Sequence, residues 1–136
     1  MKVYIRLIIL FGILTSSTAY STQQQWTAIA RITTTSVMYV DWNTLKVKDG
    51  GIRRLWNLRD MGKGIDGGTL VSMRALTEFD CKNDSIKEIQ MTGFDGPMGT
   101  GHSGPITAKA PPQWYYPAPT DSMYEILKIV CSHSVR

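Results

Sequence analysis

The chain is poor in residues that several classes of protein depend on. It has two cysteines and two histidines among 136 residues, and its formal net charge at pH 7 is only +4. Two cysteines are too few for a fold held mainly by disulfides, so a hydrophobic core must supply most of the stability. A charge this small does not predict a nucleic-acid-binding surface. With 43% hydrophobic and 19% charged residues, the composition is typical of a folded globular protein.

Motifs for metal binding and catalysis are lacking as well. His102 and His133 each stand without Cys, Asp or Glu at metal-ligand spacing. Ser103 beside His102 is not a catalytic pair, because a triad needs a base that a third group orients. Residues 99–104 have the letters GxGxxG, but Pro105 follows at once and no helical pattern comes after, so this stretch predicts a plain loop. We therefore expect no metal, no cofactor and no enzymatic activity.

The acidic residues stand singly along the chain. Nothing in their spacing brings two of them together for acid and base chemistry. Turn and surface positions are the expected role of these residues, which include Asp41, Asp60, Asp66, Glu78 and Asp80.

The longest apolar run lies at the start of the chain. A positively charged opening, an apolar run over residues 7–14 and small residues ending at Ala19 have the pattern of a secretory signal peptide. We expect residues 1–19 to be removed and residues 20–136, with a net charge of +2, to form one domain. No later run approaches the ~18 to 20 apolar residues of a transmembrane segment. The product is expected in the periplasm, at the cell surface or secreted, without a lipid anchor on an N-terminal cysteine.

Between Trp26 and Gln90 the residues have the pattern of an antiparallel sheet. Apolar, aromatic and β-branched positions alternate with polar ones, and turn residues punctuate them at short intervals. Asp49-Gly50-Gly51 supplies the positive-φ positions of a tight hairpin turn. Glycine and proline predict two loops, at 61–68 and 95–112, and the second is long enough to hide a short strand. The six strands expected are 25–33, 37–42, 46–48, 52–59, 69–80 and 87–92.

The C-terminal segment changes to helical periodicity. Ser122 and Glu125 have the spacing of a capping box at the start of a helix. The apolar side chains that follow share one stripe of that helix, namely Met123, Ile126, Leu127, Val130 and Cys131.

The two cysteines predict a disulfide between helix and sheet. Cys131 lies on the buried stripe, and Cys81 ends the longest predicted strand. After export both would meet an oxidising compartment, which favours pairing over free or intermolecular cysteines. The predicted fold is therefore α+β, with a single antiparallel β-sheet of about six strands and a C-terminal α-helix packed on it and tethered by a disulfide.

Basic residues cluster on the predicted central hairpin, interleaved with Trp42, Leu55 and Trp56. Such a surface suits an acidic partner or a sulfated polysaccharide, because arginine offers bidentate contacts and the aromatics offer contact area. A sheet edge that uses charge to block unwanted pairing has the same composition, so both interpretations stay open. The candidate partner-binding residues are Lys46, Lys48, Arg53, Arg54, Arg59 and Lys63.

Four motifs follow one another along the chain: VMYVDWNTLKVKDGGIRRLWNLRD, SMRALTEFDC, IQMTGFDGPMGTG, and WYYP ahead of SMYEILKIVC. In this order they resemble the surface-adhesin protein E family of Gram-negative bacteria, over nearly the whole mature chain. The residues that carry the resemblance are Tyr39, Asp41, Arg54, Trp56, Leu58, Asp60, Cys81, Trp114, Pro117 and Cys131.

The resemblance implies the same sheet, helix and Cys81–Cys131 disulfide. It further implies a non-enzymatic binding protein whose partners are host matrix or plasma proteins such as vitronectin, laminin and plasminogen, and a capacity to form a homodimer. A second hypothesis is a periplasmic structural or accessory subunit of an envelope assembly, whose sheet edge pairs with another chain. Adhesion through Lys and Arg should weaken with salt, whereas backbone pairing should not.

Overall fold

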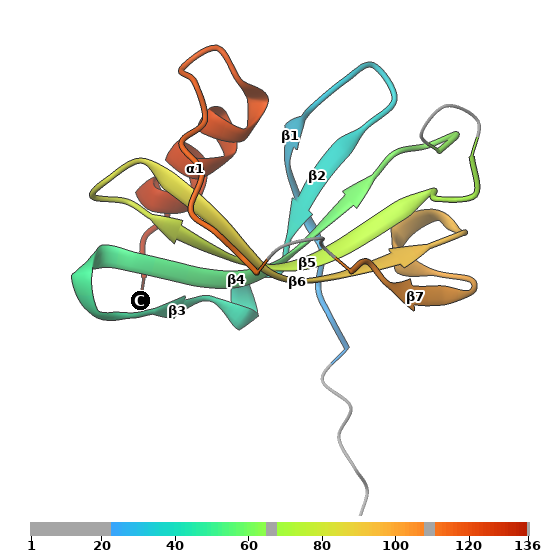
Figure 1. The fold of residues 1–136 in the computed structure, drawn as a ribbon, viewed down its shortest axis with the longest axis horizontal. Coiled ribbons are helices and arrows are strands. Elements are labelled where there is room, and N and C mark those ends of the chain that lie inside the picture. Colours follow the sequence, from blue (N-terminus) through green and yellow to red (C-terminus); the bar gives the residue numbers. More distant parts are fainter. Residues whose placement is uncertain (1–22, 65–67, 108–110, 136) are drawn as a thin grey trace, which may run out of the picture.

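A seven-stranded antiparallel sheet is the frame of the protein in the computed structural model, which describes residues 23–64, 68–107 and 111–135. The sheet order is β1-β2-β4-β5-β6-β7, and β3 pairs with β4 (Figure 1). This confirms the predicted sheet and adds β7 within the loop expected over 95–112. The predicted signal peptide lies outside the described residues. The strands are β1 (Thr27–Arg31), β2 (Val37–Val40), β3 (Lys46–Val47), β4 (Ile52–Asp60), β5 (Ser72–Asp80), β6 (Ser85–Phe94) and β7 (Ser103–Pro105).

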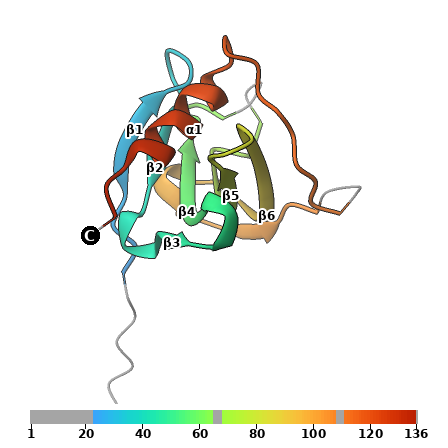
Figure 2. The same ribbon diagram turned by 90° about the vertical axis from the view of Figure 1, so that its left-hand side faces the viewer.

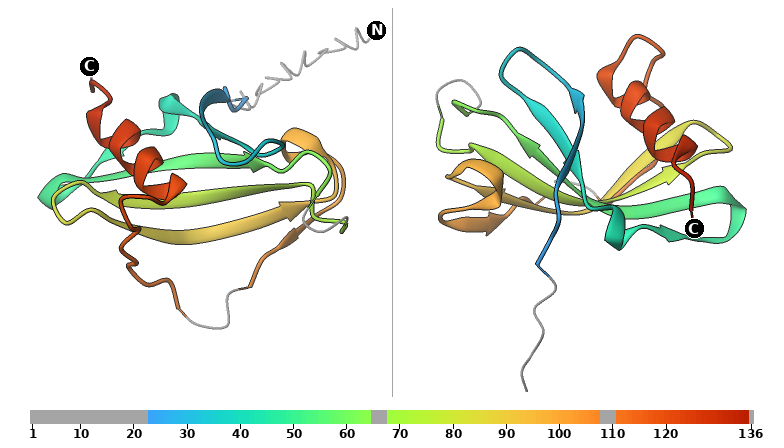
Figure 3. Two further views of the ribbon diagram at one scale, coloured as in Figure 1. Left: turned by 90° about the horizontal axis from the view of Figure 1, so that it is seen from above. Right: turned by 180° about the vertical axis from the view of Figure 1, so that it is seen from behind.

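The three longest strands, β4, β5 and β6, lie side by side at the centre (Figure 3). β4 and β5 pair without interruption from Ile52 opposite Asp80 to Asp60 opposite Ser72. The β5–β6 register shifts once, where Ile89 is the extra residue of a bulge. The uninterrupted β4–β5 pairing fixes which side chains of these strands share a face.

Local turn chemistry ends the central strands. Gly50 and Gly51, between β3 and β4, have φ angles of 78° and 81°, in the region that favours glycine. After β5, the Asp80 carboxylate accepts hydrogen bonds from the backbone N–H groups of Lys82 (3.0 Å) and Asn83 (3.1 Å). The hairpin turn at residues 49–51 and the turn role of Asp80 agree with the sequence-based expectations.

The helix α1 (Ser122–Ser132) covers one face of the sheet, beside β1 (Figure 2). Its buried side chains are on the stripe that the sequence predicts, and they meet residues from β2, β4, β5 and β6. Partly buried residues of β1 complete this core. The buried cluster consists of Met38, Val40, Leu55, Phe79, Ile86, Ile126, Leu127 and Val130.

The start of α1 differs from the expected capping box. Asp121 is the N-cap residue, with an extended backbone, and its Oδ1 accepts a hydrogen bond of 2.9 Å from the Met123 N–H. Ser122 is already in the helix. The negative charge of a carboxylate at this position also interacts favourably with the helix dipole. A neutral serine hydroxyl can cap the helix but lacks this charge.

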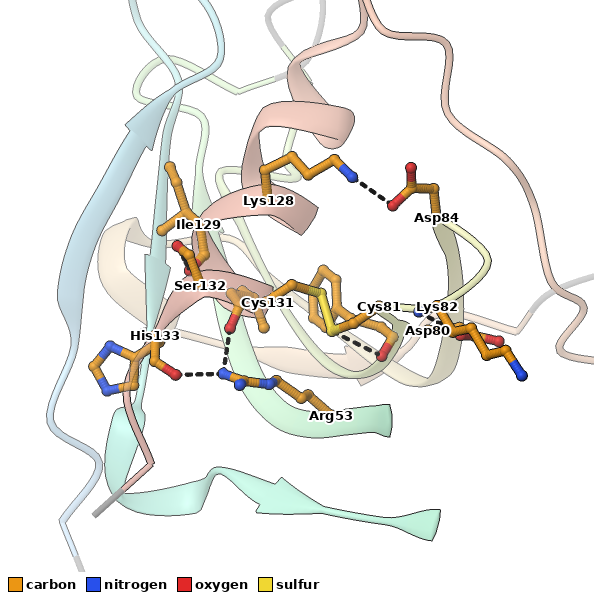
Figure 4. Close-up of a disulfide and its surroundings, with 12 residues drawn as sticks. Arg53, Asp80, Cys81, Lys82, Asp84, Lys128, Ile129, Cys131, Ser132 and His133 are labelled. Atoms are coloured by element: carbon orange, nitrogen blue, oxygen red, sulfur yellow. Dashed lines mark hydrogen bonds and ion pairs between the residues drawn. A yellow bond between two sulfur atoms is a disulfide. The ribbon is translucent and has the colours of Figure 1, made fainter. Parts of the chain in front are cut away.

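Two contacts hold the C-terminal end of α1 against the rest of the fold. Cys81 and Cys131 form the predicted disulfide, with their Cα atoms 5.6 Å apart (Figure 4). Just after the helix, the His133 ring stacks on Trp42, with ring centroids 3.7 Å apart. Trp42 begins a 3-10 turn, η1 (Trp42–Thr44), that follows β2. The helix is therefore fixed to β2 and β5, at opposite sides of β4.

Replacing the cystine by two alanines, Cys81→Ala with Cys131→Ala, should lower the free energy of unfolding. The bridged residues are 50 positions apart in sequence, and the loop-entropy model gives a loss of about 2–4 kcal/mol for such a loop. Urea unfolding followed by tryptophan fluorescence measures this. The wild-type protein in reductant is the matched control and should unfold at the same lower urea concentration. Unchanged stability of the variant would show that the disulfide is dispensable.

Candidate binding face

The face of the sheet that points away from α1 has a different character, and we call it the open face. Side chains alternate along a strand, so Arg54, Trp56 and Glu78 point to the open face while Leu55 and Phe79 point to the core. Residues 23–26, just before β1, reach this side of the sheet, where Gln24 contacts Arg74 (Figure 1). The open face therefore carries charged and aromatic side chains, whereas the core face carries apolar ones.

Glu78 is the electrostatic centre of the open face. Only 3% of its side chain is exposed, and its carboxylate contacts Lys48 Nζ at 2.7 Å, Arg54 Nη2 at 2.6 Å and Lys87 Nζ at 3.0 Å. Burial alone would raise the pKa of this carboxyl, but the hydrogen bonds from the three cations outweigh burial and lower the pKa to about 2. Glu78 is therefore an anion across the physiological pH range.

This arrangement leaves a surplus of positive charge at the surface. Three cations share one carboxylate, and the exposed fractions of the Lys48, Arg54 and Lys87 side chains are 45%, 34% and 23%. Lys46 pairs with Arg54 across β3 and β4 and so adds a fourth cation to the same face. The open face is consequently suited to an anionic group on a ligand.

Two tryptophans each lie against a cation on this side of the sheet. The Lys87 Nζ lies 4.4 Å from the centroid of the Trp114 ring, and the Arg74 guanidinium lies 5.2 Å from that of Trp56. Arg74 also donates a hydrogen bond of 3.1 Å to Gln24 Oε1. The segment before β1 is thus held on the open face by a residue of β5.

A cleft of about 580 Å³ opens between that segment, η1 and the central strands. Trp56 and Leu76 supply its apolar surface, and Arg54 and Lys46 supply its charge. Three consecutive glutamines, residues 23–25, line it together with polar residues next to η1. The cleft therefore combines apolar, amide and cationic groups.

The η1 side of the cleft is fixed by hydrogen bonds. Asp41 is 3% exposed, and its two carboxylate oxygens accept from Gln25 N–H (3.2 Å) and Asn43 N–H (3.1 Å). Asn43 Nδ2 in turn donates to Gln25 Oε1 at 3.2 Å. Thr44 Oγ1 accepts from the Trp56 N–H at 3.0 Å. These bonds hold the polar rim of the cleft in place.

The structure does not bring the six candidate basic residues onto one surface. Lys46, Lys48 and Arg54 lie on the open face. Lys63 is exposed beyond the far end of β4, while Arg53 and Arg59 point toward α1. Adjacent strand residues face opposite ways, so Arg53 and Arg54 have separate roles.

Arg53 holds the end of the helix. Its Nη1 donates hydrogen bonds to the backbone carbonyls of Val130 (2.8 Å) and His133 (2.5 Å), beside the disulfide (Figure 4). These carbonyls belong to the last turn of α1 and the residue after it, where a cation is favoured by the helix dipole. Arg59 contacts Met123 Sδ at 3.4 Å near the other end of α1. Both arginines thus stabilise the packing of the helix.

Sequence reasoning missed several residues of the open face. Glu78 was expected at a turn or the surface, but its carboxylate is buried and binds three cations. Asp41 was expected in the same kind of position, but it is buried in the rim of the cleft. No sequence pattern marked the glutamines at 23–25 as candidate binding residues. The cation–π contact of Trp114 with Lys87 joins residues far apart in sequence. Asp66 lies outside the described residues.

The other sequence features that suggest chemistry are structural in this fold. Residues 99–102 form a turn into β7, which includes residues 103 and 104, and Gly99 and Gly101 have φ angles of 73° and 82°. His102 and Asp95 make an exposed pair at 2.9 Å. Across residues 23–64, 68–107 and 111–135, no three His, Cys, Asp or Glu side chains gather at metal-binding distance, and no helix is long and apolar enough to cross a membrane.

A single antiparallel sheet, a disulfide-tethered C-terminal helix and a basic, aromatic open face make up a small α+β domain with one candidate binding surface. Residues 26–132 match the model of the family described as surface-adhesin protein E, and the chain belongs to this family. No curated protein sequence matches the chain.

Solved structures of Haemophilus influenzae protein E have a similar fold. Crystal form II of that protein is 15% identical, with a TM-score of 0.58 over 78% of this chain and 96% of that one. The protein from the non-typeable bacterium is 14% identical, with a TM-score of 0.54 over 81% and 86% of the two chains. At this identity the likeness establishes the shared fold.

Arg53→Met should lower the free energy of unfolding by about 1.5–3 kcal/mol, because the charged donor to two helix-end carbonyls is lost. Arg31→Met is the matched control, since Arg31 is exposed on β1, and it should be close to neutral. Urea unfolding of the three proteins measures the difference. Equal stabilities of the two variants would contradict the role of Arg53 as a helix tether.

Glu78→Gln should remove an acid-dependent part of the stability. The pKa of Glu78 is about 2 in the folded protein against 4.5 for a free side chain, so the unfolded state takes up the proton first. The stabilisation is complete above about pH 5 and is lost as the pH falls toward 2, by roughly 3 kcal/mol at most. Urea unfolding between pH 7 and pH 2.5 should show a flatter profile for Glu78→Gln.

The control for this pH series is Glu125→Gln, because Glu125 is an exposed glutamate on α1. It should keep the wild-type slope. A Glu78→Gln profile parallel to the wild type would mean that the three cations do not hold the Glu78 pKa down.

Proposed function

We propose that this protein is an exported, non-enzymatic adhesin that binds host extracellular-matrix or plasma proteins through its open face. Residues 1–19 act as the signal peptide and residues 20–136 as the adhesin domain. Membership of the surface-adhesin protein E family supports adhesion. The observation that carries the choice of surface is the cluster of three cations on the single buried carboxylate of Glu78.

The cationic side chains of this surface are held rigidly, and this favours binding as well as their charge. Lys48, Arg54 and Lys87 are held by a common partner, so they lose little side-chain freedom when a ligand binds. Trp114 beside Lys87 offers aromatic contact area next to the charge. Tryptophan and arginine, the residue types of Trp114 and Arg54, are enriched among the residues that dominate interface energies.

The edges of the sheet favour adhesion over assembly by strand addition. β7 has three residues and ends in Pro105, which lacks a backbone donor. At the other end of the same edge, Tyr115 already pairs with Ile86 of β6. On the opposite side, β1 has a bulge between Ala28 and Ala30. Short, irregular or occupied edges resist pairing with a further strand.

Lys46→Gln with Lys48→Gln should weaken binding to immobilised laminin or vitronectin by about three- to tenfold and reduce its salt dependence, because two exposed cations of the open face are removed. Surface plasmon resonance between 50 and 300 mM NaCl measures both effects. Glutamine at 48 leaves Arg54 and Lys87 on Glu78, so the fold should be retained.

Arg31→Gln with Lys82→Gln is the control, because it removes the same charge from exposed residues elsewhere. It should bind like the wild type at every salt concentration. Equal losses in both pairs would point to net charge rather than the open face. Protection of the protein from protease on intact cells, until the outer membrane is opened, would overturn its role as an adhesin.

A further inference from the structure

The cleft on the open face has apolar and amide groups as well as cations, so its lining selects a more particular ligand than an acidic surface. Its apolar side is formed by Trp56 and Leu76, which are neighbours across β4 and β5. Its volume of about 580 Å³ falls within the range of about 300–1,000 Å³ that is typical of small-ligand sites. The ligand unit that fits must offer one apolar surface to the indole and polar groups elsewhere.

Amide side chains dominate the polar rim. Gln23, Gln24, Gln25 and Asn43 each carry a donor and an acceptor in one plane. A hydroxyl group is also donor and acceptor at once, so a row of amides matches a row of hydroxyls. Asp41, which is only 3% exposed, accepts the backbone N–H groups of Gln25 and Asn43 and so fixes these amides in position.

The rim is already organised without a ligand. Asn43 is bonded to Gln25, Gln24 to Arg74, and Asp41 to the backbone on both sides. A site whose polar groups are fixed in advance pays little ordering cost on binding. Gln24, Gln25 and Asn43 therefore stand in a fixed pattern around the apolar side.

The cleft also has unused positive charge. Arg54 donates to Glu78 through Nε and Nη2, so Nη1 takes no part in that pair. Lys46 takes part in none of the ion pairs found among the described residues. Both cations border the cleft, next to the amide rim. The ligand should consequently carry one anionic group on the side that meets β3 and β4.

A pyranose ring with a carboxylate combines these properties. Its C–H face is apolar, its hydroxyls line the ring edge, and its carboxylate provides one negative charge. We infer that the cleft binds a carboxylated saccharide unit, with the ring against Trp56 and Leu76, the hydroxyls on the amide rim and the carboxylate at Lys46 and Arg54. This assignment rests on the proposed binding function and names the class of ligand group that the open face recognises.

The test titrates the folded protein with glucuronic acid, N-acetylneuraminic acid and neutral glucose, followed by the Trp56 indole signal in ¹H–¹⁵N NMR spectra. At least one acidic sugar should bind in the millimolar range, tenfold or more tighter than glucose. The two acidic sugars distinguish a uronic acid from a sialic acid as the source of the carboxylate. No shift of the Trp56 signal by either acidic sugar at tens of millimolar, or equal binding of glucose, would overturn the assignment.

Variants of exposed rim residues keep this test independent of folding. Lys46→Gln should weaken the acidic sugar about tenfold and leave glucose unchanged, and Asn43→Ala should weaken the acidic sugar through the lost amide. Lys82→Gln is the control, because it removes an exposed lysine outside the cleft. Binding that survives both Lys46→Gln and Asn43→Ala would place the saccharide elsewhere and overturn the inference.

Host-protein binding and sugar binding, measured on the same variants, distinguish a failure of this inference from a failure of the proposed function. If laminin or vitronectin binding depends on Lys46 and Lys48 but no sugar binds, the adhesin proposal stands and the saccharide assignment falls. If an acidic sugar binds at Trp56 but no host protein binds, the adhesin proposal falls and the cleft keeps its ligand.

Discussion

The uninterrupted antiparallel register between β4 and β5 decides what every other part of this structure can do. With nine residues in each strand and no bulge between them, it sends Leu55 and Phe79 to one side and Arg54 and Glu78 to the other. A slip of one residue would bury the charged set and expose the core. The helix, the disulfide and the ion cluster all presuppose this register, because each uses side chains from only one of the two faces.

On the core side, the register is locked by contacts to the end of α1. The disulfide joins Cys131 to the residue that follows β5, and Arg53 of β4 donates to carbonyls at the helix end. The stack of His133 on Trp42 adds a contact to the turn after β2. Three strands thus converge on one helix terminus. A covalent bond, a charged hydrogen bond and an aromatic contact hold the helix against the part of the sheet that also carries the open face.

On the open face, the same strands carry a charged surface without leaving a buried charge unpaired. Placing one carboxylate beneath three cations satisfies the buried acid and still leaves positive charge for a ligand. The segment before β1 completes the surface, because its glutamines bond to Arg74 and to residues around η1. The chain belongs to the surface-adhesin protein E family, and adhesion is the role that we propose for this surface.

Local patterns in the sequence were enough to predict strands β1 to β6, the glycine turn at residues 49–51, the apolar stripe of α1 and the pairing of Cys81 with Cys131, because each depends on period, turn chemistry or the end of one element. The three-residue strand β7 was missed, because it lies in a stretch rich in glycine and proline. The tertiary structure alone decided the roles of the charged residues. Neighbouring arginines such as Arg53 and Arg54 look alike in a sequence, but the phase of β4 sends one to the helix end and the other to Glu78. The burial of Glu78 and the cleft beside Trp56 likewise arise from strands and a leading segment that meet only after folding, so no local pattern contains them.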